Sequence, residues 1–512
     1  MAKQEDFFKN VISHAKEYGY IFASSEIYDG LSAVYDYGQN GAELKKNIKD
    51  YWWKSMVQLH QNIVGLDAAI LMHPTTWKAS GHVDAFNDPL IDNKDSKKRY
   101  RADVLVEDYA EKINQKAQKE IAKAKKRFGD KFNEEEFVTT NPRVLRYKKE
   151  EKEILERLAK SLTDENLADV KALIEELGIA CPESGSKNWT DVKQFNLMFG
   201  TKLGASADSA TDLYLRPETA QGIFVNFSNV QKTGRMKIPF GIAQIGKAFR
   251  NEITTGNFIF RTREFEMMEI EYFVKPEDSE KYYKEWIDGS MEFILSLNIN
   301  KSNLRIREHS KEDLSHYSKG TSDIEYKFPW GWAELQGIAN RGSFDLDAHS
   351  KSASKNFTIF EESTKSRYTP HVIEPSIGVD RLLLITLLDA YNEEKLESKE
   401  EKRTVLKLSP KISPIKIAIL PLSKDPQLSE LSKKIQKDLI NKGNLGKIEY
   451  DETQSNGKRY RRQDEIGTPY CVTIDFETIK DNSVTIRHRD SMDQERININ
   501  DLSQKLTSEI YN

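Results

Sequence analysis

Residues 248–273 read AFRNEITTGNFIFRTREFEMMEIEYF, and the fold predicted for the chain is organised around them. Both ends of this stretch, residues 248–253 and 264–273, alternate polar with apolar side chains and are rich in Phe, Ile and Tyr, which predicts β-strands. The turn between them is expected from four residues of the kind that favour turns, Thr254, Thr255, Gly256 and Asn257. The sequence therefore predicts two adjacent strands joined by a charged loop.

One face of these strands is expected to carry charged and aromatic side chains together. Residues two and four apart on a strand share a face, so Arg250 and Glu252 should point the same way. The same spacing aligns Phe265, Met267 and Glu269. An exposed hairpin with cross-strand ion pairs is one explanation. Arginines also bracket the loop, and guanidinium groups suit bidentate binding of phosphate oxygens, so a nucleoside triphosphate is the expected ligand.

The run FRNEI followed by RTREFEMMEIEYF resembles motif 2 of the class II aminoacyl-tRNA synthetases, in the form found in dimeric glycyl-tRNA synthetases. The resemblance implies that Arg250 holds the α-phosphate of ATP and the amino-acid carboxylate. Phe265 would stack on adenine, and Glu269 would reach the ammonium of glycine, with Met267 beside it. The remaining residues that the resemblance places at ATP in this stretch are Asn251, Glu252, Phe260, Arg261 and Arg263.

A carboxylate precedes an apolar helix in residues 214–227, YLRPETAQGIFVNF. Glu218 could simply stabilise the first turn of that helix, as acidic residues commonly do. RPETAQGIF is also similar to the amino-acid recognition loop of the same family. By that resemblance Glu218 would bind the substrate ammonium.

Residues 330–349, WGWAELQGIANRGSFDLDAH, predict a buried strand leading into a turn, with Glu334 and Arg341 as charged members. Uncompensated charges are costly inside a core, so each should have a partner, most simply a ligand. The resemblance puts Glu334, with Leu335 beside it, at the ATP and magnesium site. It puts Arg341 at the edge of the glycine pocket.

Residues 370–388, PHVIEPSIGVDRLLLITLL, predict a strand ending at Glu374 and an apolar helix beginning near Asp380. A core helix with an N-terminal Asp is the plain interpretation. The stretch also resembles motif 3 of the family, in which Arg381 would lie under adenine opposite Phe265 and reach the γ-phosphate. Glu374 and Ser376 would complete the glycine pocket. Gly378 would serve both ligands, and two further residues would line the ATP site, Val379 and Asp380.

The N-terminal part predicts a helix over residues 41–64, with Leu44, Ile48, Trp52 and Leu59 among the residues of its apolar face. Residues 68–93 combine an apolar strand, a proline and an SGH turn. Together they resemble motif 1, whose strand ends near a proline, here Pro74, and which forms the interface of a homodimer. His73 and His82 lack a third suitably spaced ligand, so a metal pair is not predicted. Farther on, RYRADVLVED implies that Arg101 contacts the amino acid.

Residues 109–180 are dense in Lys and Glu and show helical spacing, as in Ile154, Leu158, Leu162 and Leu167. They predict an insertion of charged helices, which is either a solvated module or a contact for the acceptor arm of tRNA. Some relatives have a zinc knuckle shortly afterwards, with a cysteine where this chain has Ser184, three residues after Cys181. A hydroxyl does not replace a thiolate ligand, so no structural zinc is predicted.

The sequence pattern changes after Pro410 and Pro414. Beyond them predicted strands and helices alternate over about 100 residues, as expected of an α/β domain. Its sequence GKRYRRQ mixes positive charge with a ring able to stack on a base. A solvated basic face is the plain interpretation. The region resembles the anticodon-binding domain shared by the glycyl, histidyl, prolyl and threonyl enzymes. Its expected RNA-facing residues are Lys458, Arg459, Tyr460, Arg461 and Arg462.

Bulk composition is that of an ordinary globular protein, with 31% charged residues and a net charge of −4. Any binding of nucleic acid must therefore come from local basic patches. Two cysteines far apart in the chain make a disulfide framework unexpected. The first residues lack an apolar signal segment, and the longest apolar run, residues 382–388, is too short to span a bilayer. We expect a cytoplasmic protein without a membrane segment.

The expected fold class is mixed α/β (α+β), with an antiparallel-sheet catalytic domain over residues 1–410, interrupted by the insertion at about 109–180. Residues 411–512 would form the anticodon-binding domain. The resemblance implies ligation of glycine to tRNA(Gly) with ATP and Mg²⁺, releasing AMP and pyrophosphate. One rival is a synthetase for another amino acid, against which the clustered glutamates argue. The other is a binding paralogue without activity, which could have lost Arg250, Glu269 or Arg381.

Overall fold

The computed structural model of the chain describes residues 2–129, 132–204, 210–253, 255–309, 319–362, 364–395 and 402–511. Thr254, in the predicted turn, lies outside these ranges. The chain divides into two units. The first comprises Met1–Ser80, Thr201–Phe249 and Gly256–Asn512, and the second comprises Gly81–Gly200 with Arg250–Thr255. No helix in the described ranges has the length and apolarity needed to cross a membrane.

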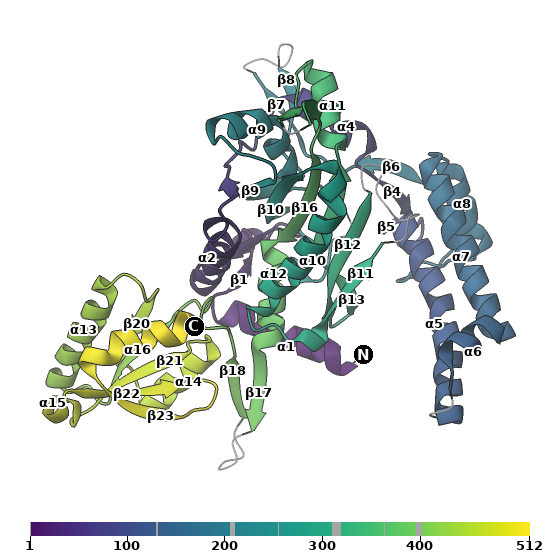
Figure 1. Ribbon diagram of the computed structural model, residues 1–512. Helices are drawn as coiled ribbons and strands as arrows, with labels where there is room; N and C mark the ends of the chain where they lie inside the picture. Colours follow the sequence, from purple (N-terminus) through teal and green to yellow (C-terminus); the bar gives the residue numbers. More distant parts are fainter. Residues whose placement is uncertain are drawn as a thin grey trace. The chain divides into compact units, whose positions relative to one another are not determined.

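The first unit is built on a seven-stranded sheet in the order β11-β12-β13-β16-β10-β9-β3 (Figure 1). All neighbours in it are antiparallel except β3 and β9. The predicted antiparallel sheet is thereby confirmed. Its strands are β3 (Ile63–Gly65), β9 (Phe240–Phe249), β10 (Glu264–Val274), β11 (Leu304–Glu308), β12 (Gly320–Phe328), β13 (Gly331–Gly342) and β16 (His371–Gly378).

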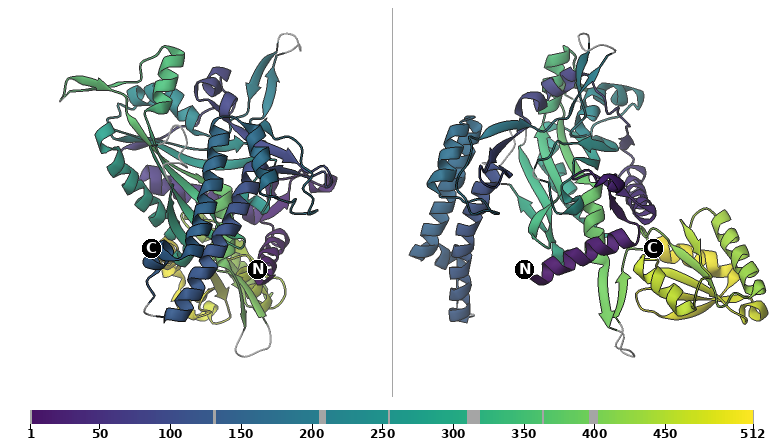
Figure 2. Two further views of the ribbon diagram at one scale, coloured as in Figure 1. Left: turned by 90° about the vertical axis from the view of Figure 1, so that its right-hand side faces the viewer. Right: turned by 180° about the vertical axis from the view of Figure 1, so that it is seen from behind.

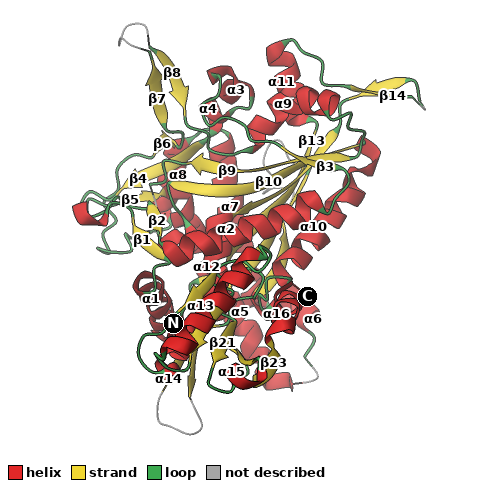
Figure 3. Cartoon of the chain, turned by 90° about the vertical axis from the view of Figure 1, so that its left-hand side faces the viewer, coloured by secondary structure: helices red, strands yellow, loops and turns green. Residues whose placement is uncertain are grey.

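The alternation along β10 gives the sheet two different faces. Met268, Ile270 and Tyr272 point into the larger core, with α2 (Gln39–Trp53), α10 (Ser279–Leu295) and α12 (Val379–Ala390). Figure 3 shows α10 lying along the sheet. On the other face Phe273 packs against α9 (Ala220–Thr233), where its ring centroid is 4.6 Å from that of Phe227. Phe265, Met267, Glu269 and Glu271 alternate with the core residues of β10. Their side chains therefore lie on the second face, where they line a polar site.

Two predicted strand limits were wrong. The strand expected over residues 248–253 ends at Phe249, so Arg250 and Glu252 do not share a strand face. The backbone leaves the sheet because the Asn251 N–H donates to the carbonyl oxygen of Leu197, at 2.7 Å, instead of to a neighbouring strand. The strand expected to end at Glu374 continues to Gly378, paired on both edges with β10 and β13.

The helix predicted over residues 41–64 is shorter. It ends at Trp53 and passes through the π-helical turn η2 (Lys54–Gln58) into β3, which pairs with β9. Leu59, assigned to the apolar face, is 71% exposed. The strand expected after residue 68 is also absent from this described segment, where Leu71 makes a single bridge to Leu215. Pro74 instead begins helix α3 (Pro74–Ala79), a position that suits proline's missing N–H.

The second unit contains the charged helices, α5 (Ala102–Phe128), α6 (Glu134–Thr140), α7 (Pro142–Thr163) and α8 (Leu167–Glu176). Figures 1 and 2 show α5 and α7 side by side. The apolar sides of α5, α7 and α8 bury Ile113, Leu158 and Val170, which form one cluster with Trp189. The second unit also contains a small antiparallel sheet of three strands, β4 (Asn87–Asp92), β5 (Arg99–Arg101) and β6 (Lys193–Asn196).

The C-terminal part of the first unit has a five-stranded mixed sheet in the order β20-β19-β21-β22-β23. Helices α13 (Pro426–Asn441) and α16 (Ile499–Tyr511) pack on one face, and Tyr460 of α14 (Asn456–Glu465) packs on the other. The predicted alternation is confirmed for β19 (Ile417–Pro421), α13, β21 (Tyr470–Ile474), β22 (Ser483–His488) and α16. Sequence patterns missed β20 (Ile448–Tyr450), α14 and β23 (Gln494–Asn498), because β20 has only 3 residues and the other two elements are almost wholly polar.

The remaining elements complete the fold around these sheets. They are α1 (Ala2–Glu17), β1 (Ile21–Ala23), η1 (Glu26–Tyr28), β2 (Tyr35–Tyr37), α4 (His82–Ala85), β7 (Gly200–Leu203), β8 (Thr211–Tyr214), η4 (Phe258–Phe260), η5 (Pro276–Asp278), η6 (Lys301–Asn303), α11 (Phe344–Ala353), β14 (Ile359–Glu361), β15 (Ser366–Tyr368), β17 (Tyr391–Lys395), β18 (Lys402–Leu406) and α15 (Thr478–Asp481).

Candidate active site

A buried carboxylate lies at the centre of the site face. Glu269 of β10 is 2% exposed and accepts hydrogen bonds at both oxygens. The Thr219 N–H donates to Oε2 at 2.9 Å, the Thr219 hydroxyl donates to the same atom, and Ser376 Oγ donates to Oε1 at 2.9 Å. Ser376 sits directly opposite Glu269 across β10 and β16. Two residues that were predicted separately for the glycine pocket, Glu269 and Ser376, are therefore brought together.

Arg341 holds a second pair of carboxylates at this face. Its guanidinium donates to Asp345 at 2.7 and 2.9 Å and to Glu374 at 2.5 Å, and the arginine is 4% exposed. Burial alone would lower the pKa of Arg341, but the two carboxylates outweigh it and raise that pKa well above its ordinary value. The expectation that a ligand is the simplest partner for Arg341 was wrong, since the chain supplies its partners.

The site holds more negative than positive groups. Burial raises the pKa of Glu269, and the neighbouring Glu218 raises it further against the hydrogen bonds from Thr219 and Ser376. Burial also raises the pKa of Glu374, whose attraction to Arg341 is opposed by Glu269 and Glu218. A small cation entering among these groups would relieve their repulsion. The arrangement is suited to binding an ammonium group.

Sequence reasoning missed several residues that build this cluster. Gln221 donates to Glu218 at 2.9 Å and to Asp345 at 3.0 Å, and His349 bonds to the Gln221 side-chain oxygen at 2.8 Å. Thr219 and Gln221 stand inside the quoted RPETAQGIF run, so the motif could have indicated them. The alternation along β10 likewise extends to Glu271, which is fully buried.

A cation and aromatic rings meet at the beginning of α12. The guanidinium carbon of Arg381 is 4.4 Å from the centroid of the Phe260 ring, which itself lies 4.9 Å from that of Phe328. Arg381 also donates to the Glu334 carbonyl oxygen at 3.0 Å and pairs with the Glu334 carboxylate at 3.4 Å. The prediction of a buried Glu334 was wrong, because its side chain is 52% exposed, while Leu335 beside it is buried.

Other residues predicted at the nucleotide have varied surroundings. Asp380 is buried and accepts from Lys45 Nζ at 2.8 Å, from the Tyr37 hydroxyl and from the Glu266 N–H at 2.8 Å, so its carboxylate ties α12 to α2 and β10. Val379 is buried with it. Gly378 lies opposite Met267 across the two strands. Phe265 and Arg261 are half-buried, as is Arg263, which donates to the Ser32 carbonyl oxygen at 2.8 Å.

Four predicted residues belong to the second unit and are described within it. Arg101 pairs with Asp88 at 3.2 Å and with Asp103 at 2.5 Å. Glu252 is 8% exposed and acts electrostatically on Arg101. The Arg250 guanidinium carbon is 5.4 Å from the centroid of the Phe86 ring. Asn251, bonded to Leu197, fixes the backbone between Arg250 and Glu252.

The predicted RNA-facing run forms helix α14, and the prediction was wrong for Arg459. This arginine is 1% exposed and donates to the backbone carbonyl oxygens of Pro421, Asp451, Leu422 and Gln454. Tyr460 bonds to Thr473 Oγ1 at 2.5 Å, and Arg487 lies 4.8 Å from its ring centroid. Arg462 is paired with Asp451. Lys458 and Arg461 are exposed.

Two places have side chains of the kind that bind metals. The first is Cys181, which is buried, with Tyr100 Oη at 3.2 Å and Ser96 Oγ at 3.4 Å from its sulfur, and Ser184 Oγ donates to Asn93.

The second place is a group of three side chains in the C-terminal part. His488, Glu495 and Glu509 bring three potential ligand atoms within 4.8 Å of one another. Lys505 pairs with both of those carboxylates, at 3.0 and 2.8 Å, so the group already has a compensating charge.

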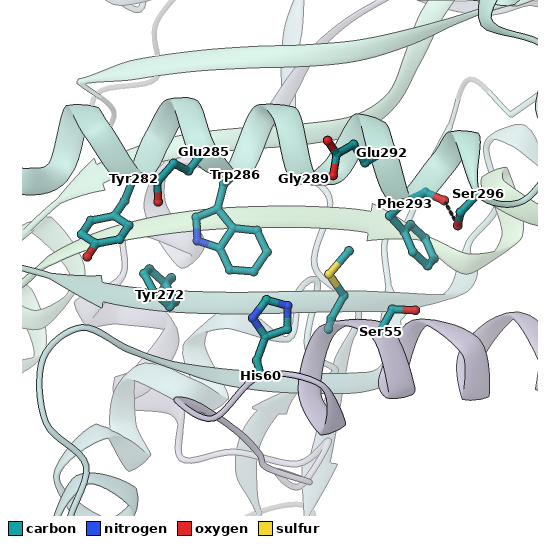
Figure 4. Close-up of a pocket in the computed structure, with 11 residues that line it drawn as sticks. Ser55, His60, Tyr272, Tyr282, Glu285, Trp286, Gly289, Glu292, Phe293 and Ser296 are labelled. Carbon is teal, nitrogen blue, oxygen red and sulfur yellow. Dashed lines mark hydrogen bonds between the residues drawn. The ribbon is translucent and has the colours of Figure 1, made fainter.

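A separate pocket of about 470 Å³ lies between η2 and α10 (Figure 4). Trp286 and Phe293 of α10 line it, with His60 and Tyr272 on the opposite side. None of the predicted site residues lines this pocket. It is distinct from the carboxylate cluster.

Comparison with known proteins follows the same division of the chain. Residues 88–197 match the family model "Glycyl-tRNA synthetase insertion domain 1", residues 202–390 match "tRNA synthetase class II core domain (G, H, P, S and T)", and residues 416–509 match "Anticodon binding domain". The chain is 48% identical over 502 residues to the glycine–tRNA ligase of Staphylococcus haemolyticus (strain JCSC1435), covering 98% of both chains. It is 48% identical over 507 residues to that of Staphylococcus aureus (strain JH9), covering 99% of both.

Proposed function

Because the chain belongs to the glycine–tRNA ligase family and has a class II core, we propose that its two-step reaction takes place at the site described above. In the first step glycine and ATP give glycyl-adenylate and pyrophosphate. In the second step the glycyl group passes to the 3′-terminal adenosine of tRNA(Gly), and AMP leaves. The enzyme is an aminoacyl-tRNA ligase, and both of its ligand classes match chemistry present on one face of the central sheet.

The first step needs no nucleophilic side chain. A carboxylate oxygen of glycine forms a bond to the α-phosphorus while the bond to the pyrophosphate oxygen breaks. Catalysis then depends on the placement of the two substrates and on positive charge near the phosphates. Arg250 and Arg381 are the residues that we assign to this charge, the first at the α-phosphate and the second at the γ-phosphate.

We assign adenine to a position between two flat stacking surfaces near the start of α12. Phe265 supplies one stacking surface, and Arg381, packed on Phe260, supplies the other. The full proposed ATP site comprises Arg250, Asn251, Glu252, Phe260, Arg261, Arg263, Phe265, Glu334, Leu335, Gly378, Val379, Asp380 and Arg381. Asp380 acts within it by holding α12 to α2 and β10.

The excess of buried carboxylates is the observation that carries the proposal for glycine. Besides burial, Glu218 raises the pKa of Glu269, and both raise the pKa of Glu374, while Arg341 beside Glu374 is already paired with two carboxylates. The ammonium of an amino acid supplies the missing positive charge. Selection of glycine must come from exclusion of a side chain, because glycine offers none to hold. The full proposed glycine site comprises Arg101, Glu218, Phe265, Met267, Glu269, Arg341, Glu374, Ser376 and Gly378.

The residues at the nucleotide site fit Mg²⁺, which prefers one or two carboxylates together with phosphate oxygens and water. Glu334 is half-exposed, and its carboxylate is 3.4 Å from Arg381. Burial raises the pKa of Asp323 on the adjacent strand, and Glu334 raises it further, so the two carboxylates act on each other. We propose that Glu334 holds Mg²⁺ brought by ATP. When bound, the ion neutralises charge on the polyphosphate.

We propose that residues 411–512 bind the anticodon end of tRNA and that residues 1–410 carry the catalysis. Lys458 and Arg461 are exposed on α14 and can meet phosphates directly. Arg459, Tyr460 and Arg462 would act by shaping the helix that presents them. The charged helices of residues 109–180 are either a solvated module or a contact for the acceptor arm.

We also propose that the enzyme is a cytoplasmic homodimer. The resemblance of α2 and the following segment to motif 1 supports the dimer, and β3 lies at the edge of the seven-stranded sheet. Cytoplasmic placement follows from its substrates, because charged tRNA is used where proteins are made. Analytical ultracentrifugation tests the dimer, and a species with the 59.0 kDa mass of one chain would contradict it.

Glycylation of tRNA(Gly) tests the whole proposal. The purified enzyme with ATP, Mg²⁺ and labelled glycine should produce glycyl-tRNA. Arg461→Ala should raise the KM for tRNA while leaving glycine activation unchanged, since Arg461 is assigned only to RNA. Lack of glycyl-tRNA formation by the unaltered enzyme would overturn the proposal.

A further inference from the structure

Glu271 is a buried acid that neither the reaction nor the packing of the core accounts for. The β10 and β16 register pairs Glu269 with Ser376 and Tyr272 with Ile373, which places Glu271 opposite Glu374. Glu271 also follows Glu269 by two residues on the same strand, so it faces the same side of the sheet. It therefore lies next to two of the proposed glycine ligands.

The carboxyl of Glu271 has no compensation in its surroundings. It is 0% exposed, and within the described part of the chain neither of its oxygens has a hydrogen-bond partner. The charged groups facing it come from four elements: Glu269 on β10, Glu374 on β16, Arg341 on β13 and Asp345 on α11. Arg341 is the single positive group among them, and it is paired with both Asp345 and Glu374.

An ionised Glu271 would be expensive in this position. A buried charge without hydrogen bonds is strongly disfavoured, and a second carboxylate opposite Glu374 would add repulsion. Burial, and after it Glu374, holds the pKa of Glu271 well above its ordinary value. An apolar side chain of similar size would avoid the cost of the unpaired oxygens. The presence of an acid here calls for a role other than stability.

We propose that Glu271 is a positioning residue of the glycine pocket: an uncharged carboxyl behind Glu374 that keeps the hydrogen-bonded pair of Glu374 and Arg341 in place for the substrate ammonium. The inference rests on the proposed function and deepens it. An uncharged carboxyl gives Glu374 a polar neighbour without repelling it. A charged neighbour would push Glu374 away, and an apolar one would remove the polarity that helps Glu374 to ionise when glycine arrives.

Two substitutions separate this role from a structural one. Glu271→Gln keeps the size and the uncharged polarity, whereas Glu271→Leu keeps the size and removes the polarity. Pyrophosphate exchange with glycine should show a KM for glycine within about twofold of the unaltered enzyme for E271Q, and at least tenfold higher for E271L. The KM for ATP should change in neither. The melting temperature of E271L should not fall, because an unpaired buried polar group is lost.

A matched control is available on the same sheet. Glu325 of β12 is also buried, but its carboxylate is paired with the Arg305 guanidinium at 2.5 Å. The same change, E325Q, should lower the melting temperature and leave the KM for glycine unchanged. E271Q should leave the melting temperature unchanged, so the melting temperatures of the two variants separate the uncharged acid from the charged one.

The result that overturns the inference is an E271L enzyme with the KM for glycine of the unaltered protein. An E271Q enzyme as impaired as E271L would overturn it too, because a charge would then be required. If E271L does not fold, E271M, which is also apolar and of similar size, is measured in its place. Its KM for glycine should likewise be at least tenfold higher, and a KM equal to that of the unaltered enzyme would contradict the inference. Absence of exchange in the unaltered enzyme would instead overturn the proposed function.

Discussion

The guanidinium of Arg381 stacks on the ring of Phe260, with 4.4 Å between the guanidinium carbon and the ring centroid. This contact joins the first turn of α12 to η4, in the loop between β9 and β10. Phe260 belongs to the motif of residues 248–273 and Arg381 to that of residues 370–388, and the fold brings the two motifs together. Arg381 is held by the ring, by the carbonyl oxygen of Glu334 and by the Glu334 carboxylate. A planar cation fixed in this way is suited to cover one face of adenine.

Replacing Arg381 should therefore disable ATP activation. Arg381→Ala is expected to lower glycine-dependent pyrophosphate exchange by about 100-fold or more, since a charge on the phosphates is lost. Arg381→Lys should recover little, because an ammonium cannot stack on Phe260 as a planar group. Arg367→Ala is the matched control, because Arg367 also lies over a ring, 5.7 Å from that of Phe360 on a surface hairpin. An active R381A enzyme would remove Arg381 from the mechanism.

Binding of glycine should release protons. Burial and neighbouring carboxylates raise the pKa of Glu374 and Glu269, so the empty site retains protons above the ordinary carboxyl pKa of 4.5. The substrate ammonium favours the ionised forms, and affinity for glycine should increase with pH until the amine of glycine loses its own proton. Calorimetry in buffers of different ionisation enthalpy measures the released protons. Proton uptake, or affinity independent of pH, would contradict this assignment.

The same groups give a stability prediction with a definite sign. A carboxyl whose pKa is raised in the folded state contributes stability that is complete below its unfolded pKa and is lost as pH rises through the folded one. The melting temperature of the ligand-free enzyme should thus decline as the pH rises beyond the ordinary carboxyl range. Glycine should offset the decline. Thermal unfolding at several pH values, with and without glycine, provides the measurement.

Arg459 and Arg461 should respond oppositely to replacement. Arg459→Ala leaves four carbonyl oxygens with one donor fewer each and removes a buried guanidinium, so it should cost the C-terminal domain about 2 to 4 kcal/mol of unfolding free energy. Arg461→Ala, on the exposed side of the same helix, should change stability by less than about 0.5 kcal/mol. Denaturant unfolding distinguishes them. Equal stability of the two variants would show that the Arg459 hydrogen bonds contribute little.

Metal removal should affect the reaction and not the fold. EDTA is expected to abolish pyrophosphate exchange, and added Mg²⁺ should restore it. A zinc chelator such as phenanthroline should leave activity and melting temperature unchanged, because Ser184 stands where a thiolate would be needed beside Cys181. Metal analysis of the purified protein provides the control. Stoichiometric zinc, or unfolding by phenanthroline, would show that a zinc site was missed.

The strands and the charge cluster were largely predictable because their signals are local. The alternation from Glu264 to Phe273 specifies a strand and the sharing of one face by Phe265, Met267 and Glu269. The RPETAQGIF run contains both Glu218 and Thr219, which donates to Glu269. The sequence alternation could also have included Glu271. A strand pattern does not predict a buried acid without a hydrogen-bond partner, so the alternation by itself assigns Glu271 no role.

Other features depend on contacts that local patterns do not encode. The chain leaves the sheet at Arg250 because Asn251 bonds to Leu197, a residue far away in sequence. Glu334 is exposed because only the later part of β13 is covered on both faces. In α14, helical spacing puts Arg459 and Gln463 on the buried side, so five consecutive residues could not all face RNA. The composition of residues 458–462 predicts a basic surface but does not separate the buried positions from the exposed ones.

Pyrophosphate exchange into ATP, with Mg²⁺ and each standard amino acid in turn and without tRNA, tests the central claim most directly. The excess of carboxylates around Arg341 predicts binding of an amino-acid ammonium, and the family predicts that the amino acid is glycine. Exchange should therefore be seen with glycine and should be at least 100-fold weaker with alanine and serine. Exchange with another amino acid in preference to glycine would contradict the specificity, and no exchange with any of them would contradict the catalytic assignment.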